Sequence, residues 1–220
     1  SILAALSIAV GVFAVGVIFS TMILIKRYME ADYFSSNPHT ARLYTQEFDD
    51  SLLDDLRRLP EVEAVDASYH IWLKIEAADG KLYLIDMYSI DSLDAIQVDT
   101  LDFEAGSPTL ADGEIYVERQ GISGMGLQIG EMVTMTLENG QTRQLKLVGA
   151  VHDVNGNPFN FSSSTSGFVT HATMETLAGS RLNNFVNLVT AGSHTDAAHV
   201  RQMADRAAEV AAANGVKVLN

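Results

Sequence analysis

Residues 2–25 read ILAALSIAVGVFAVGVIFSTMILI, a run of 24 residues with no charge and only three hydroxyl side chains. At a rise of about 1.5 Å per residue, a helix of this length reaches about 36 Å, enough to cross a hydrocarbon core about 30 Å thick. A helix also satisfies its own backbone hydrogen bonds, as any segment in lipid must. The run therefore predicts a transmembrane helix over residues 1–27, which contacts the lipid bilayer through residues 2–25.

Charged and aromatic residues follow the apolar run. Lys26 and Arg27 end it and can reach the membrane surface, with Tyr28 and Tyr33 as aromatic residues at headgroup level. The two basic residues alone favour a cytoplasmic C-terminal side, but basic residues upstream of Ser1 would reverse that orientation. Because the chain begins without Met or a basic flank, we expect upstream residues to be missing. A cleaved signal peptide is disfavoured, since its apolar core would be shorter, about 7 to 15 residues.

The composition limits the classes of function. The chain has 220 residues and a formal net charge of -14. Outside the span, about 190 residues remain, enough for one domain or two closely associated ones. Acidic residues are spread along the chain and no basic stripe exists, which argues against nucleic acid as a partner. Without cysteine, the chain has neither disulfides nor thiolate metal ligands.

Mixed helical and alternating patterns follow the span. Residues 28–37 are predicted to form a stalk that ends at Asn37-Pro38, because the residue before a proline avoids helical geometry. Four elements then follow: a strand over 41–46, a leucine-faced helix over 50–59, a strand from Val62, and a hairpin over 69–88 that turns at Asp79-Gly80. We expect residues 38–90 to be the first part of a mixed α/β subdomain.

The middle of the chain changes character and the end returns to the first pattern. Residues 91–181 hold short strand patterns and most of the glycines, which predicts an inserted β-rich subdomain. Residues 182–220 then show a strand, an amphipathic helix preceded by Ser193 and Asp196 at capping-box spacing, and a last strand over 216–219. The fold class predicted is α+β, with a discontinuous split-βαβ mixed subdomain and an inserted β-rich subdomain.

Four stretches, taken in order, resemble the MacB/FtsX-like ABC transporter permeases. They are residues 6–13 (LSIAVGVF), 59–65 (LPEVEAV), 113–117 (GEIYV) and 126–133 (GLQIGEMV). The resemblance covers essentially the whole chain and rests on the order and spacing of these stretches. It implies the first of four membrane helices followed by the extracytoplasmic core domain, located at a bacterial inner membrane with residues after about 28 outside the cytoplasm.

The resemblance also implies a function and partners. A separate or fused cytoplasmic ABC ATPase would supply the energy, and its conformational change would move the outer domain without a substrate passing through a membrane channel. Such export or mechanotransmission permeases form homodimers or heterodimers, and an envelope partner is also expected. The chain itself contains no Gly-x-x-x-x-Gly-Lys-Ser/Thr loop, so it does not bind ATP by that route.

A second hypothesis is the extracytoplasmic sensor domain of a membrane receptor. Many receptors also pair a membrane helix with an α/β domain outside the cytoplasm. A sensor would continue after Asn220 into a second span and a signalling module, whereas a permease would continue into three further spans. A membrane-tethered hydrolase ranks last, because no catalytic site is assembled in the sequence.

The chain contains residue types that form catalytic or metal sites in other proteins, but their spacing does not indicate such a site. His152, Asp153 and His171 are the best candidates for a metal or acid-base site, but their spacing matches no compact ligand motif. The glycines over 121–130 lead into a strand and fit turns better than a phosphate cradle, which would open a helix. The serine tract 162–166 has no paired base. We therefore expect a protein that is not an enzyme and has no catalytic residue, cofactor or metal.

Four aromatic residues are candidates for contacts with a partner or a lipid-like substrate. Trp72 and Tyr83 lie on the two strands of the first hairpin, and Phe159 and Phe161 lie in a long polar loop. Exposed aromatic side chains anchor partners, whereas buried ones form the core. For the hairpin pair, the core is the favoured location.

Overall fold

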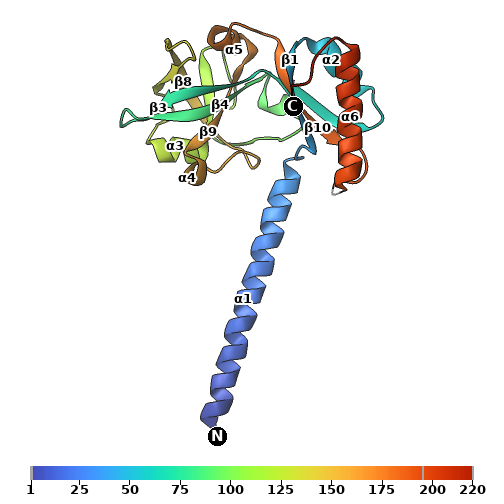
Figure 1. Ribbon diagram of the computed structural model, residues 1–220. Coiled ribbons are helices and arrows are strands. Elements are labelled where there is room, and N and C mark those ends of the chain that lie inside the picture. Colours follow the sequence, from blue (N-terminus) through green and yellow to red (C-terminus); the bar gives the residue numbers. More distant parts are fainter. Residues whose placement is uncertain (1, 195, 220) are drawn as a thin grey trace. The chain divides into compact units, whose positions relative to one another are not determined.

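The fold is described from a computed structural model, which covers residues 2–194 and 196–219, with side chains described for residues 10–31, 33–194 and 196–219 (Figure 1). The chain divides into two units, residues 1–36 and residues 37–220.

The first unit is one helix, α1 (Ile2–Ser35), of 34 residues. Its described part from Val10 to Ser35 is long and apolar enough to cross a membrane. The helix runs without interruption through Lys26 and Arg27, so the predicted span and the predicted stalk are a single helix. Its backbone hydrogen bonds therefore continue across the predicted membrane boundary.

Two sheets and their helices make up the second unit, and the smaller sheet has three strands in the order β1-β10-β2. Its elements are β1 (Ala41–Phe48), α2 (Asp50–Arg57), β2 (Val62–Ser68), β10 (Asn183–Thr190) and α6 (Ala197–Ala213). Strand β10 comes late in the chain yet lies between β1 and β2, antiparallel to both. This arrangement is the predicted discontinuous split-βαβ part.

The two helices of this part cover one apolar face of the small sheet. Leu52 and Leu56 of α2 are buried, and they share a core with Val186 and Leu188 of β10 and Ala207 of α6. Figure 1 shows α2 and α6 beside each other over this sheet.

Local side-chain hydrogen bonds set where these two helices begin. Asp49 caps α2 by accepting a hydrogen bond from the backbone N–H of Ser51. Helix α6 is capped by Asp196, whose carboxylate accepts from the N–H of Ala198. Ser193, which the capping-box spacing had placed at the cap, instead accepts a hydrogen bond from the Asp196 N–H. The predicted last strand is reduced to one bridge between Thr45 and Val218.

The larger sheet has seven strands in the order β5-β8-β6-β9-β4-β3-β7. These strands are β3 (His70–Glu76), β4 (Leu82–Ile90), β5 (Asp102–Gly106), β6 (Glu114–Glu118), β7 (Met132–Thr136), β8 (Thr142–His152) and β9 (Ser164–Thr170). Four short helical segments accompany them: η1 (Leu93–Ala95), α3 (Arg119–Met125), α4 (Phe159–Ser162) and α5 (His171–Ala178). Strand β7 pairs with β8 as well as with β3, so the sheet closes into a barrel around its own core.

The first hairpin belongs to this barrel. The sequence placed residues 69–88 with the mixed α/β part, up to a boundary at residue 90, but the chain leaves the small sheet at Ser68 and joins the barrel at His70. The reason is that β4 pairs in parallel with β9, and that Ile75, Ile85 and Met87 alternate into the barrel core. The alternation was visible in the sequence, but the partner strand was not.

Candidate functional site

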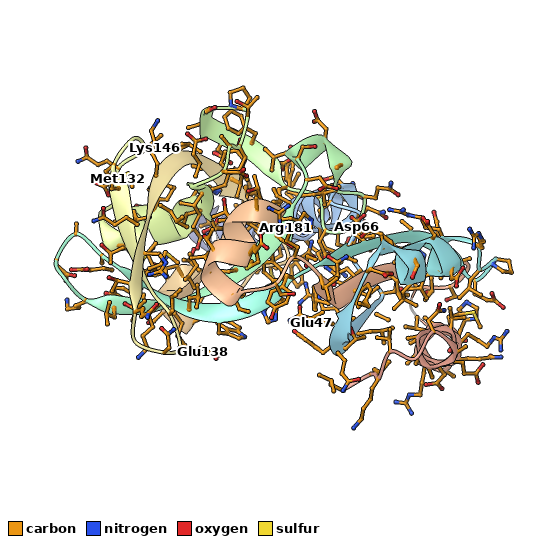
Figure 2. All side chains as sticks on the ribbon, turned by 90° about the horizontal axis from the view of Figure 1, so that it is seen from above. Glu47, Asp66, Met132, Glu138, Lys146 and Arg181 are labelled. Atoms are coloured by element: carbon orange, nitrogen blue, oxygen red, sulfur yellow. The ribbon has the colours of Figure 1, made fainter. Side chains whose placement is uncertain are left out.

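The candidate site lies where the small sheet faces the barrel, and one polar row of the small sheet builds its first wall. Asp66 of β2, Asn187 of β10 and Arg42 of β1 are aligned across the three strands by their pairing register. They point away from the core under the helices, because residues on either side of each of them face that core. Asp66 is labelled in Figure 2, between the two parts of this unit.

A connecting loop, residues 91–101, runs from β4 to β5 and lies against this polar row. Its Asp99 accepts hydrogen bonds from Arg42 Nη2 at 3.2 Å and from Asn187 Nδ2 at 2.9 Å. Asp66 in turn accepts from the backbone N–H groups of Gln97 and Val98, at 2.6 and 2.7 Å. The loop, which leads into the barrel, is therefore attached to the small sheet both through the Asp99 side chain and through the backbone of Gln97 and Val98.

The same loop binds the first residues of the second unit. The backbone N–H of Asp99 donates to the Asn37 carbonyl at 3.1 Å, and Asn37 Nδ2 donates to the Gln97 carbonyl at 2.7 Å. The backbone N–H of His39 donates to Asp99 Oδ1 at 3.0 Å, and His39 Nδ1 lies 2.9 Å from both carboxylate oxygens. Asn37 has a positive φ of 47°, a conformation that Asn tolerates better than most residues. The segment that follows α1 in sequence is thus held by one loop.

Asp99 is the centre of this polar network. Its side chain is 10% exposed and lies within ion-pairing distance of both His39 and Arg42. Burial acts to raise the pKa of Asp99, but the hydrogen bonds and charge of His39, with the charge of Arg42, outweigh it and hold that pKa below its usual value. The carboxylate is therefore ionised at neutral pH and holds the connecting loop as a charged acceptor.

A cavity of about 440 Å³ opens beside this network. Its walls come from the outer face of the small sheet, the connecting loop, strands β4 and β9 of the barrel, and the turn over residues 153–157. Four aromatic side chains line it: Trp72, Tyr88, Phe168 and Phe185. The rings of Tyr88 and Phe168 stack with centroids 5.8 Å apart, and the Phe185 ring lies 5.6 Å from that of Tyr88. This aromatic wall spans both sheets.

Charged groups on the barrel side of the cavity are held by local bonds. Asp86 is paired with His70 and accepts a hydrogen bond from the Tyr88 hydroxyl at 2.8 Å. Burial, followed by the charge of Asp86, raises the pKa of Tyr88 above its usual value, so the phenol stays protonated and donates.

Asp153 lies in a tight turn at the edge of the cavity. It accepts hydrogen bonds from the Ser166 hydroxyl at 2.7 Å and from the backbone N–H of Gly156 at 2.9 Å. Burial raises the pKa of Asp153, and the charge of Asp99 acts in the same direction. Burial likewise raises the pKa of Asp66, again with a contribution from the Asp99 charge. The charge of Asp99 therefore disfavours ionisation of both Asp66 and Asp153.

The histidines considered for a metal site are separated. His152 Nδ1 lies 3.8 Å from Glu118, and His171 Nε2 lies 3.6 Å from Asp91. Among the residues that the structure describes, no group of three His, Asp or Glu side chains is placed to hold a metal ion.

The four aromatic candidates do not come together in one place. Trp72 is 42% exposed and lines the cavity. Tyr83 is partly buried, and its ring packs on that of Phe159 at 5.2 Å between centroids. Phe159 is 8% exposed and belongs to the barrel core, whereas Phe161 is 91% exposed on α4. Of the loop pair, only Phe161 is placed to contact another molecule. The sequence favoured the core for both hairpin residues, which is correct for Tyr83 and wrong for Trp72.

Sequence reasoning missed the polar row and Asp99. A polar residue recurs at an outward position in each strand, at Arg42, Asp66 and Asn187, and this was the available signal. It identifies one face of a sheet, but the strand order and the connecting loop that meets the face are long-range features. Asp99 is 57 residues from Arg42 and 88 from Asn187.

Comparisons with solved structures agree with this architecture. The extracellular domain of the noncanonic ABC-type transporter YknZ from Gram-positive bacteria matches 82% of this chain and 100% of its own, with 13% identity and a TM-score of 0.51. The periplasmic region of MacB from Actinobacillus actinomycetemcomitans matches 81% of this chain and 86% of its own, with 11% identity and a TM-score of 0.48. Neither a protein-family model nor a curated protein sequence matches the chain.

The likeness to the YknZ domain establishes the class of fold. Over most of its length, this chain has a mixed α/β fold similar to that of the extracellular domain of the ABC-type transporter YknZ. The resemblance that the sequence motifs indicated, to MacB/FtsX-like permeases, is confirmed at the level of the fold.

Proposed function

We propose that this chain is part of the permease subunit of an ABC-type transporter, with α1 in a bacterial inner membrane and the residues after about 28 outside the cytoplasm. The observation that carries the proposal is the combination of a membrane-length apolar helix with a domain that has the fold of the YknZ extracellular domain. Neither feature alone is specific, since apolar helices anchor many kinds of domain.

In this proposal the chain transmits movement and performs no reaction. A cytoplasmic ABC ATPase changes the position of α1, and α1 passes the displacement to residues 37–39. Because a continuous helix resists bending, a displacement at one end arrives at the other as a rigid-body movement. Asp99 and the connecting loop then deliver it to both the small sheet and the barrel, since they are bonded to residues 37–39 and to β1 and β10.

The same proposal includes partners beyond the ATPase. We expect a second permease subunit, identical or different, and an envelope partner that meets the outer domain. Phe161 is the candidate residue for such a contact, because a phenylalanine 91% exposed to water has apolar area to bury.

The test breaks the helix between the membrane and the domain. Met29 lies within α1 and is exposed, so Met29→Pro interrupts the stalk while Met29→Ala keeps it helical. This chain contributes no cysteine of its own, so Phe161→Cys takes one dye on the outer domain once any reactive cysteines elsewhere in the permease and the ATPase are replaced. Energy transfer from this dye to labelled lipid headgroups is measured in the complete permease, reconstituted with its ATPase in nanodiscs, with ATP and with ADP.

We expect the transfer efficiency to differ between ATP and ADP in the parent and in Met29→Ala. The Met29→Pro variant should still bind the ATPase but lose this nucleotide dependence. A proline variant that responds like the alanine variant contradicts transmission through α1. A parent protein that neither binds an ABC ATPase nor responds to ATP contradicts the permease assignment itself.

A further inference from the structure

We propose that the cavity between the small sheet and the barrel is a binding site for an organic cation, an ammonium group that carries an aromatic or alkyl part. The proposal goes beyond transmission of movement and does not depend on it, since it concerns binding to this one domain. It rests on the size of the cavity, the balance of charge on its walls, and the aromatic faces beside the charges.

The size of the cavity suits a small organic molecule. Its volume of about 440 Å³ falls within the range of about 300 to 1,000 Å³ typical of ligand pockets. It lies at the junction of two packed parts of one domain, a common position for such pockets. A bare metal ion would leave most of this space unfilled, and the described side chains offer no three-ligand group for one.

Carboxyl groups outnumber basic groups on the walls of the cavity. Six aspartates line the cavity, against two arginines and one histidine. Both arginines already have carboxylate partners, since Arg42 pairs with Asp99 and Arg57 with Asp54.

Two of the lining carboxylates have only uncharged donors. Asp66 is held by backbone N–H groups, and Asp153 by Ser166 and backbone N–H groups. Among the described residues, neither forms an ion pair within 4.0 Å. A cation in the cavity would relieve the repulsion that Asp99 exerts on Asp66 and on Asp153, whereas an anion would add to it.

The aromatic residues of the cavity wall are the second feature that favours an organic cation. Trp72, which is 42% exposed, and the partly buried Tyr88 line the same space as the carboxylates, together with the buried residues Phe168 and Phe185. Aromatic faces attract cations that lie within about 6 Å of the ring centroid, and they also bury the apolar part of a ligand. One such contact exists in the protein itself: Cζ of Arg42 lies 5.7 Å from the centroid of Phe185 while its guanidinium bonds to Asp99. The guanidinium of Arg42, itself an organic cation, is thus bound by both an aromatic ring and a carboxylate in the cavity wall.

Trp72 makes the proposal directly measurable, because it is the only tryptophan of the chain. The intact chain, in nanodiscs of zwitterionic lipid, is titrated with benzyltrimethylammonium while Trp72 fluorescence is recorded. Benzyl alcohol and phenylmethanesulfonate carry the same benzyl group with no charge and with a negative charge. Empty nanodiscs correct for uptake of each compound by the lipid.

We expect saturable binding of the ammonium compound and at least tenfold weaker binding of the neutral and anionic compounds. Asp66→Asn and Asp153→Asn should each weaken binding of the cation by about tenfold, since each replaces a carboxyl group that can ionise beside the cation by a neutral amide. Asp205→Asn, on the exposed surface of α6 outside the cavity, is the matched control and should bind like the parent.

Three results would each overturn the site: no saturable signal, equal binding of the three benzyl compounds, or unchanged affinity in both cavity variants. The comparison of ligands uses the parent protein alone, so it remains decisive even if a variant fails to fold. Because no ATPase takes part in this measurement, its outcome is separate from that of the transmission experiment.

Discussion

The two faces of the small sheet differ in kind although they belong to the same three strands. On one face, Leu43, Val186 and Leu188 pack under α2 and α6 in an apolar core. On the other face, Arg42, Asp66 and Asn187 meet the connecting loop through directed hydrogen bonds. Apolar packing is non-directional and resists separation, whereas charged hydrogen bonds depend on distance and angle. The comparison shows that apolar packing holds the helices to one face of the small sheet, whereas hydrogen bonds and the ring contacts of Phe185 hold the junction on the other face.

The largest effect on stability is expected when packing is removed from the helix-covered face. Leu188 is fully buried, so Leu188→Ala leaves a cavity and should lower the free energy of unfolding by about 2 to 5 kcal/mol. Urea unfolding of the outer domain, followed by Trp72 fluorescence, gives the value. A loss below about 1 kcal/mol would mean that packing on this face contributes little to stability.

A smaller effect is expected on the opposite face. Asp99→Asn keeps the shape of the side chain but removes the charge that bonds His39 and Arg42. The loss of hydrogen bonds to a charged acceptor should cost about 1 to 3 kcal/mol in the same unfolding assay. The exposed Asp205→Asn is the control and should change stability by less than about 0.5 kcal/mol. If Asp99→Asn costs as little as the control, the junction does not depend on this carboxylate.

The contribution of Asp99 should also depend on pH. Its pKa is depressed in the folded protein, so its stabilisation is fully present above the unfolded-state pKa of about 3.9 and is lost as the pH falls through the folded-state value. The stability difference between the parent and Asp99→Asn should therefore be constant near pH 6 and shrink toward zero in strong acid. Other carboxylates titrate in both proteins and largely cancel in this difference. A difference that grows on acidification would reverse the assigned direction.

The smallest effect on stability is expected at the outermost aromatic residue. Phe161 is 91% exposed, so Phe161→Ser should leave the free energy of unfolding within about 0.5 kcal/mol of the parent. The same substitution should weaken binding of an envelope partner or reduce transport if Phe161 is a contact. Phe159 is buried in the barrel core and is not a suitable second position for this test. A large loss of stability in Phe161→Ser would place its ring in the core instead.

Elements with a local signal were predictable from the sequence. The apolar run predicted α1, the spacing of Leu52 and Leu56 predicted α2, and Asp79-Gly80 predicted the turn between β3 and β4. Each of these depends on residues within a few positions of one another. The split-βαβ arrangement also followed, because its second half repeats the strand and helix pattern of the first.

Features that depend on distant partners were not predictable in the same way. The inward and outward residues of the β3-β4 hairpin would alternate in the same way in either sheet. Its place in the barrel therefore became clear only from the pairing of β4 with β9. Phe159 and Phe161 are two residues apart in one polar segment, and only the short helix α4 turns one inward and one outward. Asp99 stands in a loop without periodicity, so nothing local distinguished it from other loop aspartates.

The closure of the barrel has a consequence for how this domain behaves among its neighbours. A strand at the rim of an open sheet offers unpaired amides to any passing extended chain. Strand β7 bonds to β3 on one side and to β8 on the other, which leaves β5 as the strand of this sheet with a free side. The barrel therefore offers an extended chain few unpaired amides, and among the described strands the open edges are β5 of the barrel and β1 and β2 of the small sheet.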